Sequence, residues 1–160
     1  MSDYLKTGYL KNEDVEFPKS DLLRGRMVAV TECVQEIPCN PCVESCPVNA
    51  ISMNGINGVP RVDFSRCIGC GNCVAVCPGL AMFLVGIKEG KGVVSIPYEM
   101  LPLPEKGSEV FLLNRKGERT GKGVVSGIRK TDKSRNSVIV TVEFENRELV
   151  KSVRNIEVIK

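Results

Sequence analysis

The sequence predicts an α+β fold in which a cysteine-rich domain is followed by a small all-β barrel. All eight cysteines fall between positions 33 and 77, in two segments that repeat each other. From residue 105 onward the chain has no cysteine and consists of short β-branched runs separated by turn residues. We therefore expect an N-terminal arm over residues 1–26, a cysteine-rich domain over 27–104 and a barrel over 105–160.

The N-terminal arm has no apolar pattern of its own. Its apolar residues are scattered among charged ones with no sustained helical or strand period, so it lacks a predicted core. Three interpretations remain open for it: an arm laid on a partner subunit, a tail folded back over its own domain, or a disordered segment.

The cysteine-rich domain contains an internal repeat with a period of 31 residues. Its second copy reads Cys67-x2-Cys70-x2-Cys73-x3-Cys77-Pro78, and its first copy reads Cys39-x2-Cys42-x3-Cys46-Pro47. The copies differ at one position, because Glu36 stands opposite Cys67. Cys33, three residues earlier, can take the place of the missing cysteine through a longer loop. The alternative, that Glu36 rather than Cys33 is the fourth ligand of the first site, stays open.

Thiolates are soft ligands for iron, and these short spacings let consecutive cysteines bind adjacent iron atoms of one cube-shaped 4Fe-4S cluster, called a cube below. The cysteine pattern resembles that of the bacterial-type ferredoxins with two [4Fe-4S] clusters. The resemblance implies a two-cluster ferredoxin domain whose copies exchange their last cysteine. One cube would be held by Cys46, Cys67, Cys70 and Cys73, and the other by Cys33, Cys39, Cys42 and Cys77. The resemblance supplies no catalytic residue.

Two other uses of eight cysteines are disfavoured. Zinc sites usually show separated Cys-x2-Cys pairs, whereas three cysteines precede a Cys-Pro here. A disulfide framework suits small secreted domains, and the sequence begins with no apolar signal segment.

Local residues predict how the cysteine loops are built. Pro47 and Pro78 are expected to end each loop and lead into a short helix. Gly69 and Gly71 are expected to let backbone amides approach the cube closely. Short strands are predicted over 27–30, 60–63 and 80–85. Eight apolar residues are expected to wall the cubes: Ile37, Val43, Ile51, Ile56, Val62, Ile68, Val74 and Leu80.

A hairpin and a linker follow the cysteines. Glu89-Gly90-Lys91-Gly92 is a predicted turn between strands over 82–87 and 93–96. Three prolines between 97 and 104 then predict an extended linker, because residues before proline avoid the helical conformation.

The last 56 residues predict an SH3-like barrel of five strands. The residues from Val138 to Phe144 alternate apolar and polar side chains, as a closed sheet with a buried inside requires. The predicted strands cover 109–113, 121–128, 137–144, 148–151 and 155–159, with a turn over 130–136 between the second and third.

Composition excludes several functions. The 160-residue chain has no histidine, which removes histidine-ligated haem, Rieske centres and histidine acid-base catalysis. No run of 18 apolar residues could span a membrane. Residues 106–160 carry 13 Lys and Arg against 7 Asp and Glu, but few aromatic residues that could stack on bases, so no nucleic-acid partner is expected. Iron-sulfur chemistry predicts a reducing, cytoplasmic location.

The longer layout is similar, more loosely, to the small iron-sulfur subunits of multi-subunit flavin-dependent amino-acid dehydrogenases of the proline and hydroxyproline type. The shared features are the arm, the Cys33-x5-Cys39 opening and an added tail. This resemblance implies a partner subunit that holds FAD or FMN in a hetero-oligomer, with electrons passing through the two cubes to an acceptor. A freely diffusing ferredoxin and a nucleic-acid-binding iron-sulfur or zinc protein are the alternatives.

Overall fold

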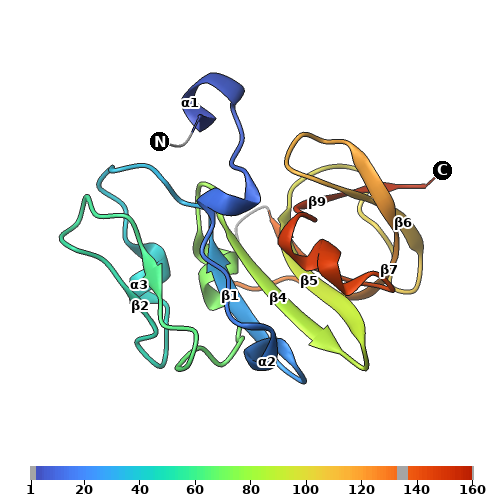
Figure 1. Ribbon diagram of the computed structural model, residues 1–160, viewed down its shortest axis with the longest axis horizontal. Helices are drawn as coiled ribbons and strands as arrows, with labels where there is room; N and C mark the ends of the chain where they lie inside the picture. The colour runs from blue at the N-terminus through green and yellow to red at the C-terminus, as the bar shows by residue number, and fades with distance from the viewer. Residues whose placement is uncertain (1–2, 133–136, 160) are drawn as a thin grey trace.

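The computed structural model describes residues 3–132 and 137–159. Residues 1–2 of the predicted arm, most of the predicted turn over 130–136 and residue 160 lie outside the described residues. Within this part of the chain, seven strands form one antiparallel sheet in the order β1-β4-β5-β8-β7-β6-β9 (Figure 1). A second sheet pairs β2 with β3. The strands are β1 Met27–Thr31, β2 Ile51–Ser52, β3 Arg61–Val62, β4 Met82–Lys88, β5 Lys91–Tyr98, β6 Glu109–Leu113, β7 Arg119–Arg129, β8 Val138–Phe144 and β9 Asn155–Val158.

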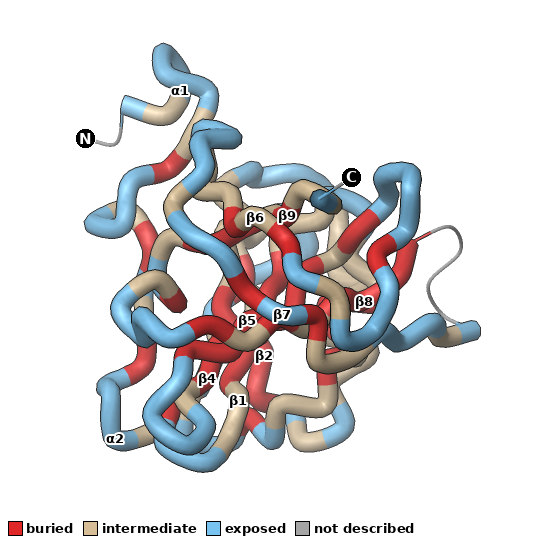
Figure 2. The backbone as a smooth tube through the Cα atoms, turned by 90° about the vertical axis from the view of Figure 1, so that its right-hand side faces the viewer, coloured by how far each residue is buried: buried red, intermediate tan, exposed pale blue. Residues whose placement is uncertain are grey.

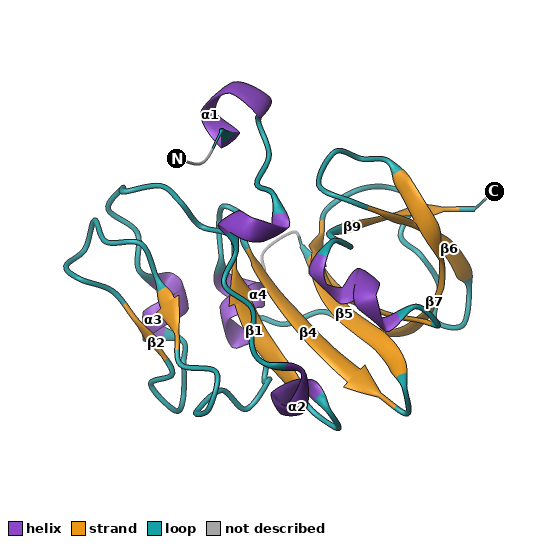
Figure 3. Ribbon diagram, in the orientation of Figure 1, coloured by secondary structure: helices purple, strands orange, loops and turns teal. Residues whose placement is uncertain are grey.

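The helices are short and lie outside the sheet. Figure 3 shows α3 and the β2–β3 pair beside the main sheet, joined to it by long loops. The helices are α1 Tyr4–Thr7, η1 Asn12–Asp14, α2 Ser20–Leu23, α3 Pro41–Glu44, α4 Asn72–Val76 and η2 Arg147–Lys151, of which η1 and η2 are 3-10 helices.

The 31-residue repeat of the sequence is also a structural repeat. The first residues of α3 and α4 are 31 positions apart, and so are Asn49 and Leu80, which adopt positive φ angles of 49° and 53°. Both helices lie before Pro47 and Pro78 rather than after them, so the predicted order of proline and helix is wrong. The physical reason is that a proline just past a helix end prevents the helix from continuing.

The predicted hairpin is confirmed. β4 pairs with β5 from Lys88↔Lys91 to Leu84↔Ser95, and the two-residue connection is Glu89-Gly90. Both connecting residues have positive φ angles, 52° and 81°, which is the conformation that two-residue hairpin loops favour. The second strand runs further than predicted, through Tyr98.

The predicted SH3-like barrel is wrong, because the strands after residue 105 belong to an open sheet. β8 pairs with β5 along its whole length, from Gly92↔Phe144 to Tyr98↔Val138. The side of β8 that a barrel would use for closure is therefore taken by the hairpin strand, and among the described residues β9 pairs only with β6. The sheet consequently runs without interruption from β1, in the cysteine-rich segment, into the C-terminal strands.

One of the five predicted C-terminal strands is a helix. Residues 147–151 form η2, and its N-cap residue Asn146 accepts a hydrogen bond from the backbone N–H of Glu148. Asparagine at this position stabilises a helix start by capping a free N–H group. The polar Asn146-Arg147-Glu148 sequence is therefore better read as a capped turn than as a strand.

The buried core follows the centre of the main sheet, as Figure 2 shows in red. Val28, Val94 and Val140 on three different strands are fully buried. The arm adds Leu10, Val15 and Leu23 to this core, whereas Leu5 on α1 is 85% exposed. The arm therefore folds back over its own chain from Leu10 onward. Among the described residues, no helix is long and apolar enough to cross a bilayer.

Candidate iron-sulfur centre

Four thiols line one enclosed pocket beneath β1 and β4. We call this pocket site A; its cysteines are Cys46, Cys67, Cys70 and Cys73. Its walls include Ala29 from β1 and Leu84 from β4. Cys67 and Cys73 are buried, with exposed fractions of 7% and 6%. Site A thus combines the last cysteine of the first repeat with the first three of the second.

The other four cysteines come from three places: Cys33 and Cys39 from the loop that follows β1, Cys42 from α3, and Cys77 from the C-terminal end of α4. We call this group, Cys33, Cys39, Cys42 and Cys77, site B. Burial, together with the neighbouring thiols Cys77, Cys33 and Cys39, raises the pKa of the Cys42 thiol to about 11. Like-charge repulsion of this kind requires the thiols to lie close together.

The two sites adjoin. Burial raises the pKa of the Cys73 thiol in site A to about 12, and Cys67 and Cys70 of the same site contribute. Cys42 of site B also raises it, and α3 and α4, which carry Cys42 and Cys73, contact each other. An electron at one site therefore has a short path to the other.

Backbone amides point at three of the sulfur atoms. Ala50 N donates to Cys46 Sγ at 3.2 Å, and Ala81 N donates to Cys77 Sγ at 3.4 Å, in equivalent positions of the repeat. Ala29 N on β1 donates to Cys67 Sγ at 3.2 Å. Hydrogen bonds to cysteine sulfur stabilise the negative charge of a cluster and tune its reduction potential.

Two glycines let the second cysteine loop approach the sheet. Gly69 and Gly71 have φ angles of 68° and 76°, a region that residues with a Cβ rarely adopt. A Cβ at Gly69 would overlap the carbonyl oxygen of Met27, and one at Gly71 would overlap the guanidinium of Arg129. Both glycines therefore lie close to the main sheet, at β1 and β7, and the approach of their amides to a cube stays a prediction.

We expect Gly69→Ala to destabilise the protein by about 1–3 kcal/mol, because the added methyl group clashes with rigid backbone and the φ angle is strained. The melting temperature of the anaerobic holoprotein measures this change. Gly79→Ala is the matched control just after Cys77 and Pro78 of the same copy of the repeat, where an added Cβ meets nothing within 4 Å. Equal melting temperatures for the two variants would contradict the expectation.

The predicted apolar wall forms only in part. Ile51 and Val74 are buried as expected, with exposed fractions of 5% and 1%. Ile68 lines site A, as predicted, although it is 60% exposed. Ile37 and Ile56 are 49% and 61% exposed, and their place in the wall stays a prediction. Val43, Val62 and Leu80 are intermediate. Ile37 and Ile68 are equivalent positions of the repeat, and Ile37 lines the cleft beside site B that is described next.

A cleft of about 1020 Å³ lies beside site B. Its walls come from the arm, from the loop that follows β1 and from the loop that precedes β4, with Tyr9, Glu36 and Leu80 as representatives. Cys33 and Cys39 are half-buried, unlike Cys67 and Cys73. Site B is thus the more accessible of the two sites.

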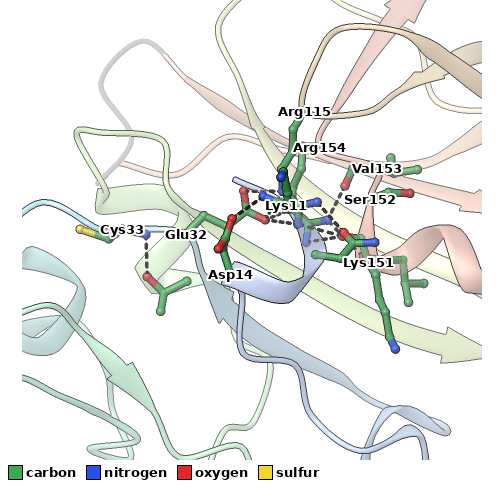
Figure 4. A network of polar contacts seen from close by, with 12 residues as sticks. Lys11, Asp14, Glu32, Cys33, Arg115, Lys151, Ser152, Val153 and Arg154 are labelled. Carbon is green, nitrogen blue, oxygen red and sulfur yellow. Dashed lines mark hydrogen bonds and ion pairs between the residues drawn. The ribbon is translucent and has the colours of Figure 1, made fainter. Parts of the chain in front are cut away.

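A buried charge cluster fixes the residue next to Cys33 (Figure 4). Glu32 accepts from Arg115 Nε at 3.0 Å and Nη2 at 2.6 Å, and from Arg154 Nε at 2.5 Å. Arg115 also donates to Asn12 of the arm, at 2.7 Å. The three charged side chains are between 5% and 11% exposed. Nothing in the local sequence marks Glu32, Arg115 and Arg154 as partners, because they are far apart along the chain.

The charge cluster has opposing effects on its members. Burial alone would raise the pKa of Glu32, but the hydrogen bond from Arg115 and the charges of both arginines outweigh it and lower the pKa. Burial lowers the pKa of Arg154 to about 10, against the favourable charge of Glu32. Arg154 remains a cation at neutral pH, where it also donates to the backbone carbonyls of Val150 and Val153.

Among the described residues, no three Cys, Asp or Glu side chains come together in a way that could hold one metal ion.

Residues 31–81, which include all eight cysteines, match the model of the 4Fe-4S dicluster domain. The chain is 39% identical over 93 residues to the polyferredoxin-like subunit of an aliphatic sulfonate oxidoreductase from Pyrococcus furiosus, covering 54% of this chain and 51% of that protein. It is 58% identical over 38 residues to a thiosulfate reductase electron transfer subunit from Salmonella typhi (24% and 19%) and 39% identical over 66 residues to a sulfite dehydrogenase subunit from Allochromatium vinosum (41% and 22%). No solved structure matches.

The predicted pair of cubes is confirmed: the dicluster domain carries two [4Fe-4S] clusters on its eight cysteines. The predicted flavin on a partner subunit stays a prediction. The domain is ferredoxin-like, and the relatives are iron-sulfur or electron-transfer subunits of various oxidoreductases. The chain spans about half the length, or less, of these curated relatives. Nothing in the comparisons supports the looser resemblance to subunits of proline-type dehydrogenases.

Proposed function

We propose that this chain is the electron-transfer subunit of a multi-subunit oxidoreductase, with no catalytic site of its own. The observation that carries the proposal is the pair of adjoining thiol sites, one enclosed and one beside an open cleft. Each cube takes up and gives back one electron at a time, and the protein holds the cubes close together and away from water.

We further propose that each thiol site is one ligand set. Cys46, Cys67, Cys70 and Cys73 hold one cube in site A, and Cys33, Cys39, Cys42 and Cys77 hold the other in site B. The pocket that the first four line, and the mutual pKa shifts of the second group, support this division. Cys33 rather than Glu36 is the first ligand of site B in this proposal.

A flavin-containing dehydrogenase is the partner that we propose. A flavin reduced by hydride transfer holds two electrons, and two one-electron cubes in series can accept them one at a time. The cleft beside site B, which the arm helps to line, is where the chain would exchange electrons with its partner. Because thiolate-bound iron clusters are sensitive to oxidation, we propose a cytoplasmic location for the complex.

A freely diffusing ferredoxin is the second candidate function. A free ferredoxin would need only the cluster-bearing half of the chain. Here the C-terminal strands extend the same sheet, and Arg115 from the C-terminal part binds Glu32, next to Cys33. Nucleic-acid binding has less support. Of the two C-terminal phenylalanines, Phe144 is buried and the ring of Phe111 is covered by Arg119 at 4.0 Å, so neither offers a free face for base stacking.

The relay predicts magnetic interaction between the cubes. In the fully reduced holoprotein, two paramagnetic cubes in adjoining sites should give a broadened, split electron paramagnetic resonance spectrum, with about eight irons per chain. The experiment compares partly and fully reduced samples, because the splitting appears only when both cubes hold an electron. Two independent, unsplit signals at full reduction would contradict a relay through adjoining cubes.

A further inference from the structure

Arg129 is the last residue of β7, and its guanidinium lies against the second cysteine loop. A Cβ placed on Gly71 would overlap Nη2 of Arg129 and lie 3.4 Å from its Cζ. Gly71 follows Cys70 directly and lines site A. Arg129 also borders the neighbouring pocket together with Gly69 and Leu84. The C-terminal strands therefore place a cation on the loop that carries a proposed ligand of site A.

Arg129 differs in its ion pairing from three other arginines of the C-terminal part. Arg115 and Arg154 share the carboxylate of Glu32, and Arg119 pairs with Glu157. Among residues 3–132 and 137–159, no carboxylate forms an ion pair with Arg129. Its positive charge is therefore not balanced by a described neighbour and acts on the cysteine loop.

We propose that Arg129 is a redox-tuning residue, which raises the reduction potential of the cube in site A above the value that the cysteine loop alone would give. The inference rests on the proposed function and its ligand sets. Accepting one electron makes a cube with four thiolates more negative by one charge, and a nearby cation stabilises that reduced state. Arg129 is exposed, so water and salt weaken the effect without removing it.

The proposal concerns the transfer of an electron from site B to site A. One electron leaves the cube in site B, which is thereby oxidised, and enters the cube in site A, which is reduced; no atom or proton has to move. Arg129 makes this transfer more favourable. At site B, two arginines bind one glutamate, which leaves one net positive charge next to Cys33. The difference in potential between the two cubes therefore depends on both sites, and Arg129 supplies the part at site A.

The test is a potentiometric titration of the anaerobic holoprotein followed by electron paramagnetic resonance. In Arg129→Gln we expect one of the two reduction steps to move to lower potential while the other stays in place. The paramagnetically shifted NMR signals of the Cys70 Cβ protons identify the moving step as that of site A. Arg129→Lys, which keeps the charge, should keep most of the potential. The difference between Arg129→Gln and the unmodified protein should shrink as the salt concentration rises.

Arg119→Gln is the matched control, because it removes the same charge from the other end of β7, where Glu157 pairs with it. We expect neither step to move in this variant. The proposal is overturned if Arg129→Gln leaves both reduction potentials unchanged or if the potential that moves belongs to site B. It is also overturned if Arg129→Lys lowers the potential as much as Arg129→Gln does. Iron content and the two-cube spectrum are recorded first, so that a failure of the proposed function is seen separately from a failure of this inference.

Discussion

Removing Cys46 together with Cys67 is expected to leave one cube intact, with about four irons per chain. Both thiols line site A, although they belong to different copies of the sequence repeat. Removing Cys46 together with Cys39 is expected to leave neither cube intact, because each site then lacks a ligand. Iron and acid-labile sulfide per chain, measured on the anaerobically purified Cys→Ala variants, distinguish the two outcomes.

These double variants test the exchange of ligands between the repeats. If each copy of the repeat held its own cube, the results would be reversed. Removing Cys46 and Cys39 would then leave one cube with about four irons per chain, and removing Cys46 and Cys67 would leave no intact cube. The pair Cys42 and Cys77, which both belong to site B, is the matched variant of the first double substitution. It should also leave one cube, the one in site A.

The Glu32→Gln variant is expected to lose about 3–5 kcal/mol of unfolding free energy, because it leaves two buried arginines without their counter-charge. Three parts of the chain would be loosened together, since the charge cluster joins the arm, the end of β1 and the segment after η2. Chemical denaturation of the anaerobic holoprotein measures the loss. Replacing Arg154 by Met in the Glu32→Gln background should recover part of it, because one buried charge is then removed.

The contribution of Glu32 should also depend on pH. The pKa of Glu32 is lowered in the folded protein, so the ionised carboxylate is stabilised by folding. This contribution is fully present above the ordinary value of 4.5 and is lost as the pH falls through the lowered folded pKa. The unmodified protein and Glu32→Gln should therefore converge in stability below pH 4.5. Glu157→Gln, at an exposed ion pair with Arg119, should show a much smaller loss at neutral pH; an equal loss would contradict the account.

The sequence predicted the chemistry of the centre better than its surroundings. Cysteine spacing is a local pattern, and few residue types bind iron clusters. The cofactors can therefore be inferred from a short stretch of sequence. The hairpin was also predictable, because its turn is rich in glycine. In the structure, Glu89-Gly90 adopts the positive φ angles of a two-residue turn. The high exposure of Ile37 and Ile56 was not predictable, because the same sequence lets an apolar residue in a loop face either the cube or the solvent.

The failures concern long-range pairing. Whether strands over 109–158 close on themselves depends on which strand takes the free edge of β8, and β5 takes it from the cysteine-rich half. The alternation of Val138–Phe144 is compatible with both arrangements. Glu32, Arg115 and Arg154 are likewise joined only by the fold, since 83 and 122 residues separate Glu32 from its two partners. Arg129 is marked neither by its neighbours in sequence nor by a motif.

The central claim, that the chain works as a subunit of an oxidoreductase, is tested most directly by anaerobic affinity purification from native extract, with iron, sulfide and flavin assayed on the eluted material. We expect about eight irons per chain and a stoichiometric flavin on a larger co-eluting chain, whose reduction also reduces the cubes. A chain that elutes alone at 17.5 kDa with about eight irons would contradict the subunit assignment and favour a free ferredoxin. Zinc in place of iron would contradict the account as a whole.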